Sequence, residues 1–366
     1  MFRKYTPTFY LILPGVRAEL LKTWSAPYLI RSMPFFPCPG VCATLRLVRI
    51  KTFVRFVLLL ALPSCIAEAP SGAGSILPSG YPAPNLDLPW FDENSGSLAE
   101  TERDWAIARG TVVWARGLGL DTLPIGEVVA TLGTTFVGTP YKPGTLEIPG
   151  QERLVVNLLT FDCVTLVEHV LVLARLTVSS ELMENEPSFR DRYRDELTRV
   201  RYRDGILSGY PSRLHYFSEW IRDADAKGLA RSLSEELGGI EDRRPIGFMS
   251  ANPESYRQLG EVSGALEAIR EMEERVTEAS RFYIPQDQIA EGEGRIQNGD
   301  VIAAVSTLEG LDIAHTGIAL WQRDRLHILH APLVGDSVEI SIQPLAERIQ
   351  GFSSQMGIMV ARPLQP

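Results

Sequence analysis

Cysteine is scarce in this sequence of 366 residues. Four cysteines are present, and three of them, Cys38, Cys42 and Cys65, lie within the first 65 residues. Beyond Cys65 only Cys163 remains, so no structural disulfide can form in that part of the chain. A lone thiol there is either a small buried core residue or a reactive group. Apolar residues make up 45% and charged residues 22%, the ordinary composition of a globular protein.

The first 70 residues also lack an apolar run long enough to cross a bilayer. A basic stretch from Arg46 to Arg55 precedes a short apolar run at 56–62 and then small residues. This order predicts a secretory signal and an exported, periplasmic protein. Two processing routes stay open: a lipobox-like "LPSC" that would leave a lipidated Cys65, and an "AEA" cleavage site at 67–69. Because such signals begin a protein, we expect 1–45 to be an over-extended start, with a genuine long leader as the alternative.

Positive charge is in deficit beyond this segment. Residues 1–64 carry nine Lys and Arg against one Glu, a charge of +8, whereas the whole chain is at −9, which leaves −17 for the part from Cys65 onward. Such an acidic body repels nucleic acid and anionic lipid headgroups. We therefore expect no nucleic-acid partner, and a membrane contact only through a lipid on Cys65.

Three segments are predicted from these patterns: a leader and signal at 1–69, a Pro/Gly/Ser-rich tether at 70–97, and one domain at 98–366. Helical patterns begin at about Ser97, which has a Glu three residues on, and continue to about 281. The later apolar runs are short and β-branched, as in "GDVIAAVST", "IAHTGIALW", "LHILHAP", "VEISI" and "GIMVARP". Helices followed by strands in meander order predict an α+β fold with an antiparallel sheet.

Cys163 lies in "FDCVTLVEHV", at the start of an apolar helix whose inward face it shares with Val167 and Val170. Thr160 or Asp162 can cap this helix. Free N–H groups and the helix dipole favour a thiolate in the first turn, and the same N–H groups can stabilise an oxyanion. These features favour a nucleophile over an inert core thiol only in part, so both interpretations stay open.

A thiol nucleophile needs a base and a group that orients the base. His315 shares a strand face with Gly317. If 323–324 is a two-residue hairpin loop, His330 lies diagonal to His315 on the same face and His327 lies on the other. A loop longer or shorter by one residue would reverse that choice. The alternative for each histidine is a hydrogen-bonded sheet residue. A zinc site is disfavoured because close ligand pairs are missing, and we expect no metal and no cofactor.

Several motifs, in order, resemble the N-acetylmuramoyl-L-alanine amidase-like family of the NlpC-type branch of papain-like cysteine hydrolases. They are "GTPYKPGTLE", "LVVNLLTFDCVTLVEHVLVLARL", "RYRDGILSGYPSRLHYFSEWI", "GLDIAHTGIAL" and "LHILHAP", and the likeness covers most of 125–366. It implies a papain-like fold, with extra helices, in which the cysteine helix packs on an antiparallel sheet. It also implies a peptidoglycan hydrolase that cuts the lactyl–L-Ala amide of muropeptides, with a preference for 1,6-anhydro sugars.

Carried over by position, the resemblance makes Cys163 the nucleophile, His315 the base and His330 the residue that orients the base. The motif here is Asp-Cys-Val-Thr rather than the Asp-Cys-Ser-Gly of the wider superfamily. That departure argues against the rival activity, a γ-D-Glu–diaminopimelate endopeptidase. A non-catalytic exported binding lipoprotein is the rival outside the enzymes.

Three further residues are predicted to contact substrate. Tyr141 matches a tyrosine often found beside the cysteine in such folds, where it can donate to an oxyanion or to substrate. Arg213 and His215 suit a peptide carboxylate and a sugar. The structural alternative for Arg213 is a helix-cap partner.

Overall fold

The computed structural model describes residues 96–97, 99–180 and 185–366. The predicted over-extended start, the secretory signal, the Cys65 lipid site and almost all of the tether lie outside the described residues. The boundary between tether and domain therefore stays a prediction. None of the described helices is long and apolar enough to cross a membrane.

The described chain begins with a small hairpin in which β1 (Gly96–Ser97) pairs with β2 (Glu100–Thr101). Helix α1 (Glu102–Gly117) follows, so the expected helix start at Ser97 is wrong. The reason is a reciprocal cap at Thr101, four residues later: the Asp104 N–H donates to Thr101 Oγ1 at 3.2 Å, and the Thr101 N–H donates to Asp104 Oδ2 at 2.9 Å.

The helices come mostly before the strands. After α1 the longer ones are α2 (Ile125–Thr134), α3 (Cys163–Val178), α4 (Glu186–Arg201), α5 (Phe217–Ala226) and α8 (Ala265–Glu278). Shorter ones are α6 (Phe248–Ala251), α7 (Arg257–Glu261), α9 (Ile289–Gly292) and α10 (Leu345–Gln350). The predicted α+β arrangement is confirmed.

One antiparallel sheet of eight strands forms the other layer. Its order is β4 (Ile240–Glu241), β5 (Phe282–Pro285), β10 (Gln355–Pro363), β6 (Val301–Ser306), β7 (Ile313–Gln322), β8 (Arg325–His330) and β9 (Glu339–Ile340), and β3 (Ala230–Ser232) also pairs with β10. The β7–β8 register runs from the pair Gln322–Arg325 to the pair Ile318–Leu329, so the predicted two-residue loop is confirmed.

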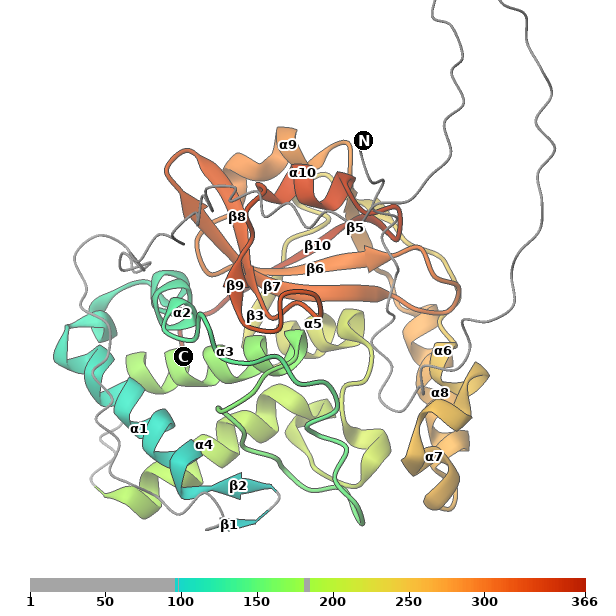
Figure 1. Cartoon of the computed structure of the whole chain (residues 1–366). Helices are drawn as coiled ribbons and strands as arrows, with labels where there is room; N and C mark the ends of the chain where they lie inside the picture. Colours follow the sequence, from blue (N-terminus) through green and yellow to red (C-terminus); the bar gives the residue numbers. More distant parts are fainter. Residues whose placement is uncertain (1–95, 98, 181–184) are drawn as a thin grey trace, which may run out of the picture. The chain divides into compact units, whose positions relative to one another are not determined.

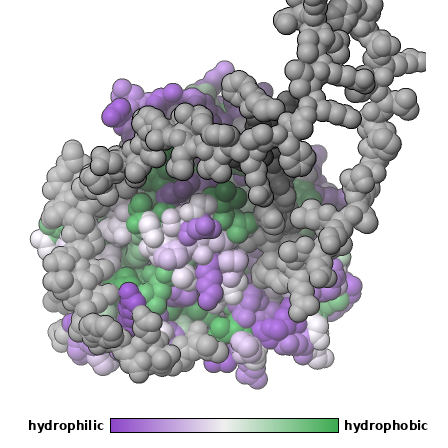
Figure 2. Space-filling view, in the orientation of Figure 1, coloured by the Kyte–Doolittle hydropathy of each residue, from purple (hydrophilic) through white to green (hydrophobic). Residues whose placement is uncertain are grey.

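The two faces of the sheet are covered by different helices (Figure 1). Val167 and Val170 of α3 share a buried cluster with Ile318 and Leu329, so the predicted inward face of the cysteine helix does pack on the sheet. On the opposite face Ile349 of α10 joins a second cluster with strand residues such as Ala319 and Ile328. Figure 2 shows hydrophilic surface interrupted by smaller apolar patches. The central strands are thus buried on both sides.

Gly317 is predicted to be indispensable for this packing. An added Cβ would lie 2.6 Å from Ile328 Cγ1 and 2.6 Å from the Leu329 carbonyl oxygen, so backbone would have to move. We expect Gly317→Ala to lower the free energy of unfolding by about 1–3 kcal/mol, measured by urea denaturation. Gly117→Ala is the matched control, since no atom apart from its chain neighbours and the adjacent backbone of its own helix lies within 4 Å of its Cβ position. Equal unfolding midpoints for the two variants would contradict the argument.

Candidate active site

Cys163 is the first residue of α3, and Asp162 is its N-cap. Asp162 Oδ1 accepts the N–H groups of Val164 at 3.1 Å and Thr165 at 2.8 Å, and the Asp162 N–H donates to Thr165 Oγ1. Of the two predicted caps, Asp162 is therefore confirmed. The Asp162 carboxylate occupies two of the free N–H groups of the first turn, and the N–H of Cys163 itself is not among them.

The thiol is almost fully enclosed, with Cys163 only 7% exposed. Burial raises its pKa to about 11, and the Asp162 carboxylate adds to the rise, while the backbone N–H and hydroxyl of Thr316 oppose it. The expectation that the helix start favours a thiolate is therefore wrong for the resting protein, because desolvation outweighs the helix dipole. Near pH 7 the side chain is a neutral thiol that needs a base.

His315 and His330 form a buried pair. His315 Nε2 lies 2.8 Å from His330 Nδ1, and the two rings meet edge to face. Burial, followed by the charge of Arg348, lowers the pKa of His315 to about 3. The pKa of His330 is also lowered, by burial, by His315 and by Arg348. Both imidazoles are therefore neutral near pH 7, and the predicted side-by-side placement of the two rings is confirmed.

Strand β7 contacts the start of α3 through the residue that follows His315. Thr316, the residue after His315, donates from Oγ1 to the carbonyl oxygen of Cys163 at 2.8 Å. Among the described residues, the second ring nitrogen of His315, Nδ1, has no hydrogen-bond partner, since the pair with His330 uses Nε2. A neutral imidazole with one nitrogen unengaged can accept a proton.

Tyr141 is near enough to Cys163 for the two side chains to interact electrostatically. Its hydroxyl is buried and has no hydrogen-bond partner among the described residues. Burial raises the pKa of Tyr141, and the charges of Cys163 and Asp162 raise it further, so the phenol remains protonated. Backbone contacts fix the residue: its N–H donates to the Asp336 carbonyl oxygen at 2.8 Å, and it bridges to Phe161.

Arg213 and His215 lie in a different environment from the one predicted. The Arg213 guanidinium is buried between Glu147, at 3.0 Å, and Glu152, at 3.3 Å. The His215 Nε2 is 2.9 Å from the Tyr210 carbonyl oxygen, and burial, then the charge of Arg213, lowers its pKa to about 3. Because Arg213 already has two carboxylate partners, its side-chain contacts favour a structural ion pair over a substrate contact. The helix-cap alternative also has support, since the Arg213 N–H donates to the Tyr210 carbonyl oxygen and caps the short 3₁₀ helix Tyr210–Ser212. Substrate binding by either residue stays a prediction.

The other two histidines have structural partners. His327 Nδ1 lies 2.8 Å from the Ser341 carbonyl oxygen, and His169 Nδ1 lies 2.7 Å from the Tyr193 hydroxyl. Within the described ranges, no group of three or more His, Cys, Asp or Glu side chains is placed to hold a metal ion.

Sequence reasoning missed two residues at this site. Thr316 could have been found, because it is the polar neighbour of His315 on the sheet that the cysteine helix was predicted to pack on. Arg348 could not, because nothing in the sequence places α10 against β8. Its guanidinium lies over the Phe352 ring at 4.9 Å and has no ion-pair partner among the described residues.

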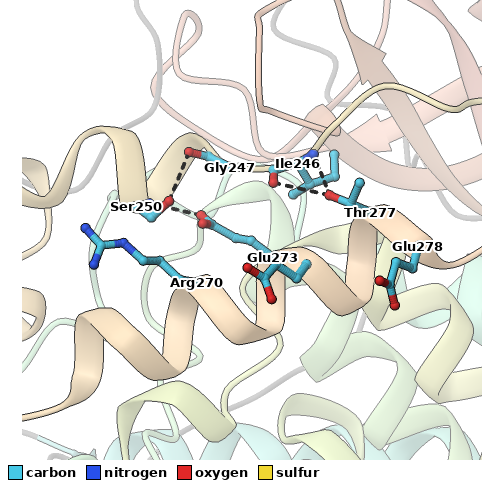
Figure 3. A pocket seen from close by; sticks show the side chains of 8 residues that line it. Ile246, Gly247, Ser250, Arg270, Glu273, Thr277 and Glu278 are labelled. Atoms are coloured by element: carbon cyan, nitrogen blue, oxygen red, sulfur yellow. Dashed lines mark hydrogen bonds between the residues drawn. The ribbon is translucent and has the colours of Figure 1, made fainter.

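A hollow of about 330 Å³ between α6 and α8 contains none of the predicted residues (Figure 3). Its most buried carboxylate, Glu273, accepts the Tyr216 hydroxyl at 2.7 Å and the Ser250 N–H at 3.0 Å. Since internal donors occupy that carboxylate, the Cys163–His315 region remains the candidate site.

Comparisons with known proteins cover this part of the chain. A family model described as N-acetylmuramoyl-L-alanine amidase-like matches residues 131–355, more than half of the chain. A crystal structure of an N-acetylmuramoyl-L-alanine amidase from Bacteroides uniformis has 31% identity and a TM-score of 0.60, covering 66% of this chain and 99% of its own. The matched span contains Tyr141, Cys163, His315 and His330.

Two further solved structures are similar. A Bacteroides fragilis protein named as a possible xylanase has 33% identity and a TM-score of 0.58, covering 63% of this chain and 98% of its own. A Legionella pneumophila protein with 21% identity and a TM-score of 0.51 covers 71% and 97%, and shows likeness of fold alone. No curated protein matches the chain.

The contacts of Arg213 predict a stability role. Arg213→Met would leave Glu147 and Glu152 facing each other without their cation, so we expect the free energy of unfolding to fall by about 3–5 kcal/mol. Arg231→Met is the control, because the Arg231–Glu236 pair is at the surface and is expected to contribute at most about 1 kcal/mol. Thermal or urea unfolding measures both. If Arg213→Met were as stable as the wild type, the ion pair would not be structural and substrate binding by Arg213 would be favoured instead.

The raised pKa of Cys163 predicts the pH dependence of its alkylation. Only the thiolate reacts, so the iodoacetamide rate at Cys163 should rise roughly tenfold per pH unit up to about pH 11, whereas a free cysteine levels off near about pH 8.5. Peptide mass spectrometry separates Cys163 from the other three thiols, and glutathione serves as the reference. A plateau near neutral pH would instead indicate a preformed thiolate–imidazolium pair.

Proposed function

Because the chain belongs to the N-acetylmuramoyl-L-alanine amidase-like family, we propose that it is a cysteine-dependent amidase that cuts the lactyl–L-Ala bond of muropeptides, preferably those with a 1,6-anhydro sugar. The observation that carries the cysteine mechanism is the 2.8 Å contact between His315 Nε2 and His330 Nδ1. It leaves Nδ1 of His315 for the thiol, and Thr316 holds this strand against the Cys163 backbone.

The layer arrangement supports assignment to the NlpC-type branch of papain-like hydrolases. The helix that begins at Cys163 packs on one face of an antiparallel sheet, and that sheet carries both histidines. In this proposal residues 98–366 form the hydrolase domain. Export by the predicted signal at 46–69 would bring it to the periplasm, where peptidoglycan lies, either as a soluble protein or through a lipid on Cys65.

The tautomers follow from the proposed roles. If His315 Nδ1 is to accept the thiol proton, the ring's one hydrogen must be on Nε2, which then donates to His330 Nδ1. The Cys163 thiol is neutral at rest, so its proton passes to His315 as Sγ attacks the lactyl carbonyl carbon. The products of this step are a tetrahedral oxyanion and an imidazolium.

Two donors are suited to the oxyanion. Asp162 already accepts the N–H groups of Val164 and Thr165, which leaves the N–H of Cys163 itself. The Tyr141 hydroxyl, which is buried and has no hydrogen-bond partner in the described part of the chain, is the second donor. Of the helix N–H groups expected to stabilise the oxyanion, only that of Cys163 is assigned this role, and the Tyr141 phenol takes the place of a second one.

The rest of the cycle conserves the proton. As the C–N bond breaks, His315 protonates the departing nitrogen of L-alanine, and the peptide leaves as a free amine. Water then attacks the thioester while His315 accepts its proton, and the lactyl carboxylate leaves as the thiol forms again. No metal or cofactor enters any step.

Rival activities fit these residues less well. A glycosidase, suggested by the name of the Bacteroides fragilis protein, would use two carboxylates across a glycosidic bond, whereas a thiol and two imidazoles suit acyl transfer. A γ-D-Glu–diaminopimelate endopeptidase would share the mechanism and differ only in the bond cut. A binding protein without activity would not need an unengaged imidazole nitrogen on a strand that is hydrogen-bonded to the Cys163 backbone.

A muropeptide digest tests the proposal. The full chain, Cys163→Ser and His315→Ala are incubated with soluble anhydro and reducing muropeptides, and the products are weighed by mass spectrometry. We expect free peptide and intact sugar from the wild type, a faster reaction with the anhydro form, and a loss of at least about a hundredfold in both variants. A shortened peptide stem would indicate the endopeptidase, and full activity of Cys163→Ser would exclude the cysteine mechanism.

A further inference from the structure

His330 has a second ring nitrogen whose environment the mechanism above does not explain. Nε2 is buried and has no hydrogen-bond partner among the described residues. The nearest anionic group is the carboxylate of Glu339, whose Oε1 lies 3.7 Å away. That separation is slightly too long for a hydrogen bond, and a small side-chain rotation would close it.

The backbone brings these two residues together in two ways. In the β8–β9 register, His330 is directly opposite Glu339. Gly335, with φ +129°, lies close to the same carboxylate, since a Cβ added there would approach Glu339 Oε2 to 3.1 Å. The missing side chain at Gly335 therefore makes room for the Glu339 carboxylate beside the imidazole. Strand pairing and loop conformation independently favour this juxtaposition.

The proposed tautomers explain why His330 Nε2 needs an acceptor such as Glu339. When His315 Nε2 donates to His330 Nδ1, His330 must carry its own hydrogen on Nε2. A buried N–H without an acceptor is unfavourable, and the competing tautomer of His330 would reverse the donor direction. His315 would then carry its hydrogen on Nδ1 and could not accept the thiol proton. An acceptor at His330 Nε2 thus decides whether the base is available.

We propose that Glu339 is a positioning residue that accepts the Nε2–H of His330 and so fixes the tautomers of both histidines. This inference rests on the proposed function. When His315 takes the thiol proton, the carboxylate also stabilises the positive charge that spreads over the pair. Glu339 acts only through His330, and no proton needs to reach it.

Other charges near the pair set the balance that Glu339 shifts. Besides burial, the positive charge of Arg348, on α10, lowers the pKa of both histidines. Burial lowers the pKa of Arg348 itself, and the negative charge of Glu339 opposes that shift. Asp162, the N-cap of α3, and Asp336, in the β8–β9 loop, are carboxylates of neighbouring elements, and neither is among the groups that shift the pKa of His315 or His330. Removal of the Glu339 charge leaves Arg348 less opposed, which disfavours the imidazolium.

The experiment reads the tautomers directly. The full chain labelled with ¹⁵N-histidine is studied by long-range ¹H–¹⁵N NMR without substrate, as wild type, Glu339→Gln and Glu339→Ala. A His330→Asn spectrum assigns the His330 signals. Glu347→Gln is the matched control, since Glu347 is an exposed glutamate of α10 that pairs with Arg325 at 2.7 Å. Muropeptide kinetics as a function of pH complete the set.

We expect hydrogen on Nε2 of His330 in wild type, Glu347→Gln and Glu339→Gln, whose amide oxygen can still accept, and a mixture of tautomers in Glu339→Ala. We expect kcat to fall about 10- to 100-fold in Glu339→Ala, with KM unchanged, as for the loss of one charge-assisted hydrogen bond. Glu339→Gln should fall in between. In both Glu339 variants the limb of the pH profile that reports His315 should move to lower pH.

Hydrogen on Nδ1 of His330 in the wild type would overturn the proposal, as would wild-type tautomers in Glu339→Ala. Because the spectra need no substrate, they decide the role of Glu339 even if the lactyl–L-Ala amide is not the bond cut. A wild type that is inactive on muropeptides, together with a Glu339-dependent tautomer, would contradict the proposed function and support the positioning role.

Discussion

The hydrogen bond from Thr316 to the carbonyl oxygen of Cys163 joins the two halves of the candidate site. The thiol belongs to the start of a helix, and the histidines belong to strands that follow it by about 150 residues in the sequence. The Thr316 side chain reaches the helix, and its neighbour His315 carries the ring that pairs with His330. Thr316 thus holds the strand against the helix, and His315, the residue before it, supplies the proposed base. The cap at Asp162 and the register of β7 and β8 serve this single junction.

Burial decides the protonation states around this junction. The thiol pKa is raised to about 11 and that of His315 is lowered to about 3, so both groups are neutral near pH 7. A neutral pair does not react with every electrophile that diffuses in, as an exposed thiolate would. Charge separation then depends on groups that stabilise the oxyanion and the imidazolium together. Catalysis therefore depends on those groups and not on a thiolate–imidazolium pair that is already formed in the resting protein.

Local signals predicted much of this architecture. The Asp162 cap, the inward face of α3 and the separation of His330 from His327 follow from residues within one or two elements. Two of the failures involve contacts between distant segments. The partners of Arg213 are Glu147 and Glu152, about 60 residues earlier, and no periodic pattern in the sequence predicts these two ion pairs. The sign of the Cys163 pKa shift was missed because desolvation depends on what covers the thiol. Helix α1 begins later than expected because Thr101 offers a better reciprocal cap than Ser97.

The sheet lies between α3 and α10, so the packing around the thiol and the charge that acts on the histidines come from opposite faces of the sheet. Packing around the nucleophile is set by the cluster that α3 shares with one face, whereas Arg348 belongs to the helix over the other face. A substitution on α10 can therefore alter the basicity of the imidazoles without repacking the thiol. Relatives that work at different pH values could diverge along this one short helix while the cysteine helix stays the same. Directed evolution of the pH optimum would best begin by randomising residues 345–352.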